Sequence, residues 1–212
     1  MRWAHLPIAR RKRSACSSSP QCDDDGADAV LGVTFQCVLD AALVGTDWAW
    51  AEIYRDLSPP ILAFLRARGA AEPEDLTGEV FVQIVRDVRR FSGDERDFRA
   101  WCFAIARNRL IDDGRRRSRR PVDLVADAGW EVADSGDVAA DALEAIARDR
   151  LRRLIDGLAP DQRDVLLLRI LGELTVDEVA RVVGKSPGAV KALQRRGLAA
   201  LAREMPAAGV PL

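Results

Sequence analysis

Histidine is almost absent from this 212-residue sequence, and cysteine, tyrosine and long apolar runs are scarce. The single histidine, His5, lies in a polar N-terminal stretch, and no glycine-rich phosphate loop occurs. The sequence therefore offers neither the general base nor the phosphate cradle expected of many enzymes. The four cysteines, at positions 16, 22, 37 and 102, lack the paired short spacing of a zinc site, and we expect ordinary reduced thiols. We expect a non-enzymatic protein without catalytic residues, metal or cofactor.

No stretch approaches the ~20 consecutive apolar residues that span a bilayer. The basic cluster at residues 10–13 is followed by serine-rich sequence, whereas a secretory signal would continue with an apolar core. We therefore expect a cytoplasmic protein with no membrane insertion.

The composition favours helices. Hydrophobic residues make up 48% and charged residues 31% of the chain, aromatic residues only 6%, and alanine, leucine and arginine are abundant. The length allows two compact domains of modest size. We expect an all-α protein.

The formal net charge of -1 hides a segregation of charge along the chain. Six arginines fall between residues 109 and 120, whereas residues 121–147 contain seven acidic residues and no lysine or arginine. Such a segment repels itself and extends. The pattern predicts a flexible acidic linker over residues 121–141 between two working surfaces.

Helical periodicity is clear in the first half. Residues 47–65 have apolar residues at helical spacing, interrupted by Pro59 and Pro60, which predicts two short helices with a break. An amphipathic helix over residues 76–90 follows, with Val85 among its inward-facing residues. A second runs from Phe98 into the arginine cluster and is expected to fray or end near Gly114.

In the second half, helices are expected at about residues 142–158 and 160–171, followed by unusually clear helix boundaries. Thr175 and Glu178 match the capping box that starts a helix, and Gly184 can end it. Ser186 can cap the next helix, with Pro187 at its first position. A short helix, a tight turn and a second helix form the helix-turn-helix plan, whose second helix enters the major groove of DNA.

The side chains of this second helix fit such a role. Val190, Leu193 and Leu198 are expected to face the core, while polar side chains lie on other faces and can reach bases and phosphates. The candidate residues for duplex binding are Lys185, Ser186, Lys191, Gln194, Arg195 and Arg196. The alternative interpretation of this segment alone is a generic helical hairpin with a solvated basic face.

Two blocks of the sequence together resemble the extracytoplasmic-function (ECF) group of bacterial RNA polymerase sigma factors. The first comprises EDLTGEVF at residues 74–81 and FRAWCFAIARNRLID at residues 98–112. The second comprises LAP at residues 158–160, Arg163, TVDEVA at residues 175–180 and SPGAVK at residues 186–191. The two blocks occur in the order and spacing of that family. The sequence differs from the residues usual in that family at Val85, Cys102 and Gly114.

The resemblance implies a sigma region 2-like domain at residues 47–120 and a region 4-like helix-turn-helix domain at residues 142–205. Residues 1–46 remain as a flexible extension and residues 206–212 as a tail. It also implies that Asp75, Glu79 and Phe81 bind the clamp helices in the largest subunit of core RNA polymerase. Promoter DNA would be the second partner, and many family members are also held by an anti-sigma factor.

The resemblance further implies a division of promoter contacts. The helix-turn-helix would read the minus-35 element, while the loop at residues 91–97 would hold a base flipped from the minus-10 element and assist DNA melting. The implied minus-10 residues are Trp101, Asn108, Arg109, Arg115, Arg116 and Arg117. Trp101 is the exception, because a tryptophan on an apolar helical face is more often a core residue than a stacking platform. The alternative function is a helix-turn-helix regulator that binds duplex DNA without core polymerase.

Overall fold

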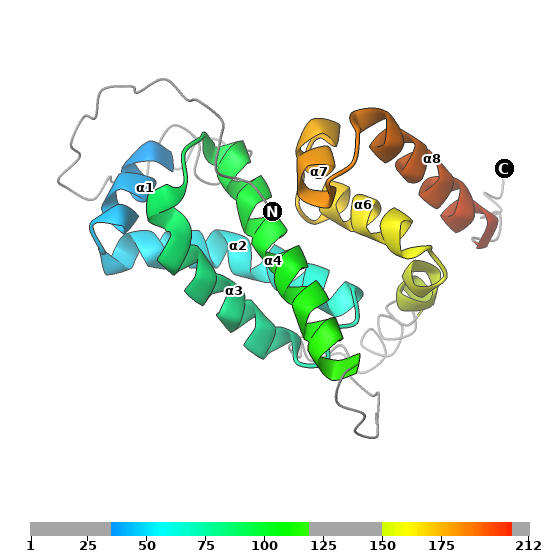
Figure 1. Cartoon of the computed structure of the whole chain (residues 1–212), viewed down its shortest axis with the longest axis horizontal. Helices are drawn as coiled ribbons and strands as arrows, with labels where there is room; N and C mark the ends of the chain where they lie inside the picture. Colours follow the sequence, from blue (N-terminus) through cyan, green and yellow to red (C-terminus); the bar gives the residue numbers. More distant parts are fainter. Residues whose placement is uncertain (1–34, 119–149, 205–212) are drawn as a thin grey trace, which may run out of the picture.

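The computed structural model of this protein describes residues 35–118 and 150–204, which are helices joined by short connections, without a strand in those two ranges (Figure 1). The first group comprises α1 (Phe35–Leu43), α2 (Asp47–Ala67), α3 (Pro73–Asp87), the 3-10 turn η2 (Val88–Arg90) and α4 (Glu95–Ser118). The second comprises α6 (Pro160–Ile170), α7 (Val176–Val183) and α8 (Pro187–Glu204), preceded by a helical segment at residues 150–156. The all-α prediction is confirmed.

The first helix, α1, lies where the sequence predicted a flexible extension up to residue 46, and that prediction is wrong for residues 35–43. Phe35, Val38, Leu39 and Ala42 are buried at helical spacing and pack into the core of the first group. The Trp50 Nε1–H donates to the Ala42 carbonyl at 3.1 Å, which ties the end of α1 to α2. Residues 1–34 lie outside the described part of the chain.

The helix α2 runs without interruption through Pro59 and Pro60, so the predicted break is wrong. Proline in a helix interior removes a backbone hydrogen bond and costs about 3 kcal/mol. A buried apolar stripe along the helix offsets this cost, since each buried large side chain contributes roughly 1.5–3 kcal/mol. The stripe is formed by Ile53, Leu57, Ile61, Phe64 and Leu65. Tertiary packing therefore overrides the local penalty.

The amphipathic helix predicted over residues 76–90 is present as α3 and η2. Leu76, Val80 and Ile84 are buried as expected, but Val85 is 50% exposed, which contradicts its placement on the inner face. The helix α4 continues past Gly114 to Ser118, so the predicted end near this glycine is also wrong. Ion pairs one turn apart along the end of α4 are consistent with its continuation.

The helix-turn-helix boundaries agree with the sequence prediction. Thr175 Oγ1 accepts from the Glu178 N–H at 3.3 Å, and Glu178 Oε2 accepts from the Thr175 N–H at 2.6 Å, which completes the capping box. Gly184 has a left-handed backbone with φ of 69° and ends α7. Ser186 Oγ then accepts from the Ala189 N–H at 3.3 Å at the start of α8. The capping box thus fixes the start of α7, and the caps at Gly184 and Ser186 set the turn between α7 and α8.

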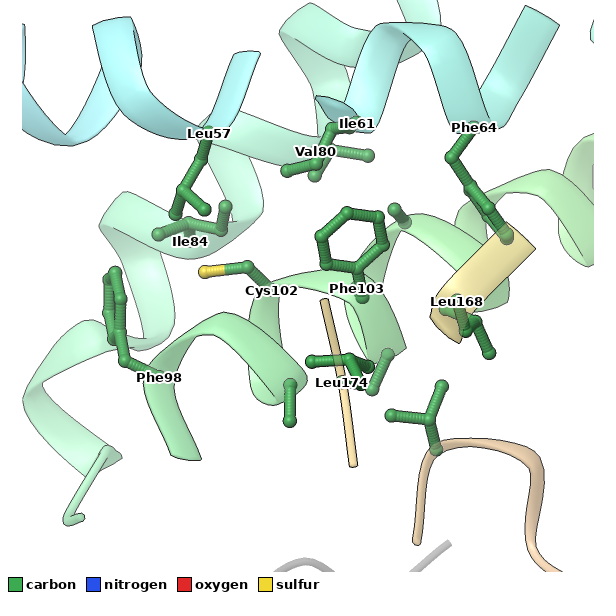
Figure 2. Packing of buried hydrophobic residues seen from close by; sticks show 14 of the residues in the cluster. Leu57, Ile61, Phe64, Val80, Ile84, Phe98, Cys102, Phe103, Leu168 and Leu174 are labelled. Atoms are coloured by element: carbon green, nitrogen blue, oxygen red, sulfur yellow. The ribbon is translucent and has the colours of Figure 1, made fainter. Parts of the chain in front are cut away.

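The two groups of helices share one hydrophobic core. Figure 2 shows Phe103 of α4 between Ile61 and Phe64 of α2 on one side and Leu174, which precedes α7, on the other. The helix α4 packs on α7, and α2 packs on α6. The described parts of the two predicted domains therefore pack against each other through this core. The predicted linker at residues 121–141 and tail at residues 206–212 lie outside the described residues.

Among the described helices, none is both long and apolar enough to cross a membrane. Within the same ranges, no cluster of three or more histidine, cysteine, aspartate or glutamate side chains could hold a metal ion.

Candidate nucleic-acid and polymerase interfaces

The start of α8 presents a basic surface on a helix whose inner face is well anchored. Val190 is fully buried and Leu193 nearly so, as predicted, and both turn toward the core of the second group. Lys191, Arg195 and Arg196 are exposed, while Gln194 is half-buried. The structure thus brings four of the six predicted minus-35 residues together along one helix. This arrangement offers cations for phosphates and an amide and guanidinium for base edges.

The other two predicted minus-35 residues have intramolecular partners in the turn. Lys185 Nζ lies 2.9 Å from Asp161 Oδ2 of α6, and the Ser186 hydroxyl serves as the cap of α8. Both residues remain close to the helix N-terminus, where a phosphate is favoured.

One residue of α8 lies on the opposite side from that predicted. Leu198 is 49% exposed, whereas its neighbour Gly197 is buried against α6. Adjacent helical residues point about 100° apart, so a buried Gly197 leaves Leu198 outside the contact. The prediction that Leu198 faces the core was wrong, because the close contact of Gly197 with α6 sets the rotation of α8.

The loop before α4 is bordered by an aromatic cluster. Phe91, Phe98 and Trp101 form three ring pairs, with centroids 5.1 to 5.7 Å apart. Phe35 of α1 extends this cluster through Phe98 at 5.5 Å. Trp101 is only partly buried, so it both packs against the cluster and keeps an accessible part beside the loop. The packing role of Trp101 is therefore present, and its contact with a base stays a prediction.

The predicted minus-10 residues on α4 form a polar ridge. Asn108 is exposed, and each arginine of the ridge has a partner. Arg109 donates to Gln83 of α3 and lies 3.6 Å from Glu79, and Arg116 lies 3.5 Å from the same carboxylate. Arg115 pairs with Asp112 at 3.5 Å and Arg117 with Asp113 at 2.9 Å. Exposed ion pairs of this kind contribute about 0–1 kcal/mol, so phosphates could replace the carboxylates at small cost.

The exposed face of α3 carries two of the three predicted polymerase contacts. Asp75 and Glu79 are exposed. Phe81 is only 8% exposed, because its ring packs on Tyr54 of α2 with centroids 4.6 Å apart. Phe81 therefore packs behind the exposed face of α3 and offers little surface area to a partner.

The same face contains two apolar residues that the sequence analysis did not select as contacts. Val82 and Val85 are 49% and 50% exposed. Val82 lies about one helical turn after Glu79, and Val85 about one turn after Val82. Contact residues of this kind can be recognised in a sequence as apolar residues that fall outside the buried stripe of an amphipathic helix. Glu79 lies between this face and the arginines of α4, so it borders both candidate surfaces.

Two family matches follow the two groups of helices. Residues 53–120 match the family described as Sigma-70 region 2, and residues 148–201 match the family described as Sigma-70, region 4. The first match excludes the alternative of a regulator that shares only the helix-turn-helix, because the melting and core-binding region is also present. The two regions in this order define a transcription initiation factor of the sigma-70 class.

Curated relatives refine this class. The ECF RNA polymerase sigma factor BldN of Streptomyces coelicolor is 32% identical, with 94% of this chain and 76% of the relative covered. The ECF RNA polymerase sigma factor SigD of Mycobacterium tuberculosis is 30% identical over 84% of this chain and 87% of the relative. The chain belongs to the ECF family of RNA polymerase sigma factors. It directs RNA polymerase to promoters, and sigma factors act as non-enzymatic initiation factors.

Solved structures agree at the level of the fold. CnrH in complex with the cytosolic domain of CnrY has a TM-score of 0.57 and 21% identity, covering 79% of this chain and 94% of that chain. The sigma factor RpoE in complex with the anti-sigma factor NepR from Bartonella quintana has a TM-score of 0.56 and 19% identity, covering 73% and 94%. The helical arrangement described above is therefore that of known sigma factors.

Proposed function

We propose that this sigma factor divides promoter recognition between the two described surfaces. The turn before α8 and the first half of α8 read the minus-35 duplex through Lys185, Ser186, Lys191, Gln194, Arg195 and Arg196. The predicted loop at residues 91–97 is shorter in the structure, because α4 begins at Glu95. Residues 91–94, the first turn of α4 and the ridge of α4 engage the minus-10 element through Trp101, Asn108, Arg109, Arg115, Arg116 and Arg117. The observation that carries this proposal is the capped, anchored α8 with its exposed cations, in the same chain as an aromatic cluster beside a basic ridge.

The proposed core-binding surface is the exposed face of α3. Asp75 and Glu79 provide charge, and Val82 and Val85 provide apolar area for the clamp helices of the largest polymerase subunit. Phe81 holds this face on Tyr54 and contributes indirectly. The site of action is the cytoplasm, where core polymerase and promoters are found.

Within the same proposal, an anti-sigma factor is a further partner. The support is analogy: two structures with this fold contain their sigma factor bound to CnrY and to the anti-sigma factor NepR. A pull-down with this protein from a lysate of its own host would identify the partner.

The experiment that tests the division of roles is in vitro transcription from a pool of genomic promoter fragments, with core RNA polymerase alone and with this protein added. We expect protein-dependent start sites preceded by a shared two-part motif. Fragments with a scrambled upstream element should lose the minus-35 contribution, and fragments with a scrambled downstream element should fail to open. Specific duplex binding without core and no protein-dependent initiation would contradict the proposal.

A further inference from the structure

A row of polar side chains on α3 reaches Arg109 of α4. Glu79, Gln83 and Asp87 recur every four residues, so they lie along one side of α3, and α4 packs beside that helix (Figure 1). Glu79 and Gln83 both contact Arg109. Gln83 also bonds to Asp87, one turn further along α3. We call Glu79, Gln83 and Asp87 the α3 polar row, in which Gln83 is the uncharged member.

The side-chain amide of Gln83 has one chemically favourable orientation. Its Nε2 donates to Asp87 Oδ2, and its Oε1 accepts from Arg109 Nη2. A guanidinium only donates hydrogen bonds, and an ionised carboxylate only accepts them. If the amide were turned over, donors would face each other at Arg109 and acceptors would face each other at Asp87. Asp87 therefore fixes the direction of the Gln83 carbonyl, and that carbonyl fixes the Arg109 side chain.

The contact with Gln83 holds Arg109 without neutralising its charge. A carboxylate partner competes with a phosphate for a guanidinium, whereas an amide oxygen occupies one of its five N–H donors and leaves the positive charge in place. Arg109 Nη1 lies 3.6 Å from Glu79 Oε2, which is longer than a hydrogen bond, so the bond to Gln83 is the tighter restraint. The Arg109 side chain is 30% exposed, so its remaining donors can meet a ligand.

We propose that Gln83 is a positioning residue for promoter melting, which holds the Arg109 guanidinium in a fixed direction for a phosphate of the separated minus-10 strand. The inference rests on the proposed minus-10 role of Arg109. A long arginine side chain loses conformational freedom when it binds a phosphate, and a side chain that is already held loses less. Gln83 thus strengthens a phosphate contact that it does not itself make.

Gln83 lies apart from the face of α3 that is proposed to bind core polymerase. Its side chain is half-buried against α4, whereas its neighbour Val82 is 49% exposed on that face. A substitution at Gln83 can therefore be tested for its effect on the minus-10 strand while binding to core is measured separately.

The test measures binding of the minus-10 strand by core RNA polymerase in complex with the full-length protein. The probe is a labelled single-stranded oligonucleotide with the nontemplate minus-10 sequence of a promoter found by in vitro transcription. Fluorescence anisotropy gives its affinity across a salt series. Gln83→Met keeps the length of the side chain and removes the amide. We expect roughly threefold to tenfold weaker binding and a salt dependence that is shallower by up to about 0.7 units, the value for one phosphate on a single strand.

Gln36→Met is the matched control. Gln36 of α1 donates to Asp40, four residues further on, at 3.1 Å, but within the described residues no arginine bonds to its amide. This variant should bind the oligonucleotide as the unaltered protein does. Circular dichroism and titration with core verify that each variant keeps its helices and its affinity for polymerase. Should Gln83→Met lose either, Asp87→Asn is measured instead, because it allows the Gln83 amide to turn over and should weaken strand binding in the same direction.

Arg109→Ala separates this inference from the proposed function. We expect it to weaken binding by about tenfold, because a hydrogen-bonded charge is lost. Gln83→Met should add no further loss in the Arg109→Ala background, because Gln83 acts through that arginine. Unchanged binding by Gln83→Met alone, or losses that multiply in the double variant, would overturn the positioning role and leave the proposed function intact. Normal binding by Arg109→Ala would overturn the proposed minus-10 contact of Arg109 together with the inference.

Discussion

Gly197 of α8 lies so close to Leu166 of α6 that a Cβ at position 197 would stand 2.9 Å from Leu166 Cδ1. The two helices therefore meet at a point that accepts no side chain without movement. Since α8 carries the proposed minus-35 surface, this contact sets the position of that surface on the rest of region 4.

The first prediction concerns this contact. Gly197→Ala should lower the free energy of unfolding by roughly 1–3 kcal/mol, because an added methyl overpacks the junction with Leu166. Gly188→Ala, on the same helix with open space around it, should be neutral or stabilising by about 0.4–1 kcal/mol. Chemical denaturation followed by circular dichroism compares the two. Equal effects of both substitutions would contradict the packing role of Gly197.

The second prediction concerns pH. Burial raises the pKa of Asp56 despite the opposing charge of Arg99, whereas the hydrogen bond from Arg66 lowers the pKa of Glu74. The folded protein therefore holds a proton on Asp56 more tightly than the unfolded chain does, and one on Glu74 less tightly. As pH falls toward the usual aspartate value of about 4, stability relative to Asp56→Asn should rise, and stability relative to Glu74→Gln should fall.

Denaturant titrations of the unaltered protein and both variants between pH 7 and the acid limit of the fold measure these differences. The two differences should have opposite signs of slope. A common sign would mean that the environments of Asp56 and Glu74 do not differ in the way their contacts imply.

The third prediction concerns thiol reactivity. Cys102 is fully buried, and burial raises the pKa of its thiol well above the usual range, so it stays protonated and shielded. Alkylation of Cys102 in the native protein should be on the order of a hundredfold slower than alkylation of the partly exposed Cys37. Peptide mass spectrometry separates the two sites. In denaturant the two rates should converge, and comparable rates in the native protein would refute the prediction.

The fourth prediction separates phosphate contacts from base contacts on α8. Lys191→Ala and Arg196→Ala should weaken binding to all promoters alike and reduce the salt dependence by about one unit each, whereas Gln194→Ala and Arg195→Ala should change base preference. Arg203→Ala, an exposed residue in the last turn of α8, serves as the control for loss of one charge. Binding of the polymerase complex to promoter variants across a salt series measures both effects. Uniform loss in all four variants would remove the distinction.

The fifth prediction concerns core polymerase. Asp75→Lys and Glu79→Lys should weaken binding to core by about tenfold or more, because each reverses a charge on the proposed contact face. Asp47→Lys reverses an exposed charge at the start of α2 and should bind core normally. Titration of labelled full-length protein with core gives the affinities. Normal binding by both α3 variants would place the core-binding surface elsewhere.

The helix-turn-helix could be predicted in detail because its determinants are local. Thr175, Glu178, Gly184 and Ser186 act within a few residues of their own positions, through caps and a left-handed turn that depend on residue type and spacing. For the same reason Val190 and Leu193 were placed correctly on the inner face of α8. The order and spacing of the two sequence blocks also sufficed to indicate the family.

Other features depended on residues far apart in the chain. The helix α2 continues through Pro59 and Pro60 because its buried apolar stripe outweighs the cost of proline in a helix. The helix α1 is held in place because the Phe35 ring packs on the Phe98 ring of α4. Phe81 is covered by Tyr54, a contact between two helices that no spacing rule contains.

The sequence by itself determined the all-α class, the boundaries of the reading helix and the cations that it presents, because each follows from periodicity, capping and side-chain chemistry. Only the tertiary structure decided that Asp164 lies between Arg68 and Arg107, 57 residues or more away along the chain. A charged residue on a helix looks solvated in sequence, and whether it is buried with a partner depends on which surfaces meet. That is a property of the packed chain, because pairing energies act through space.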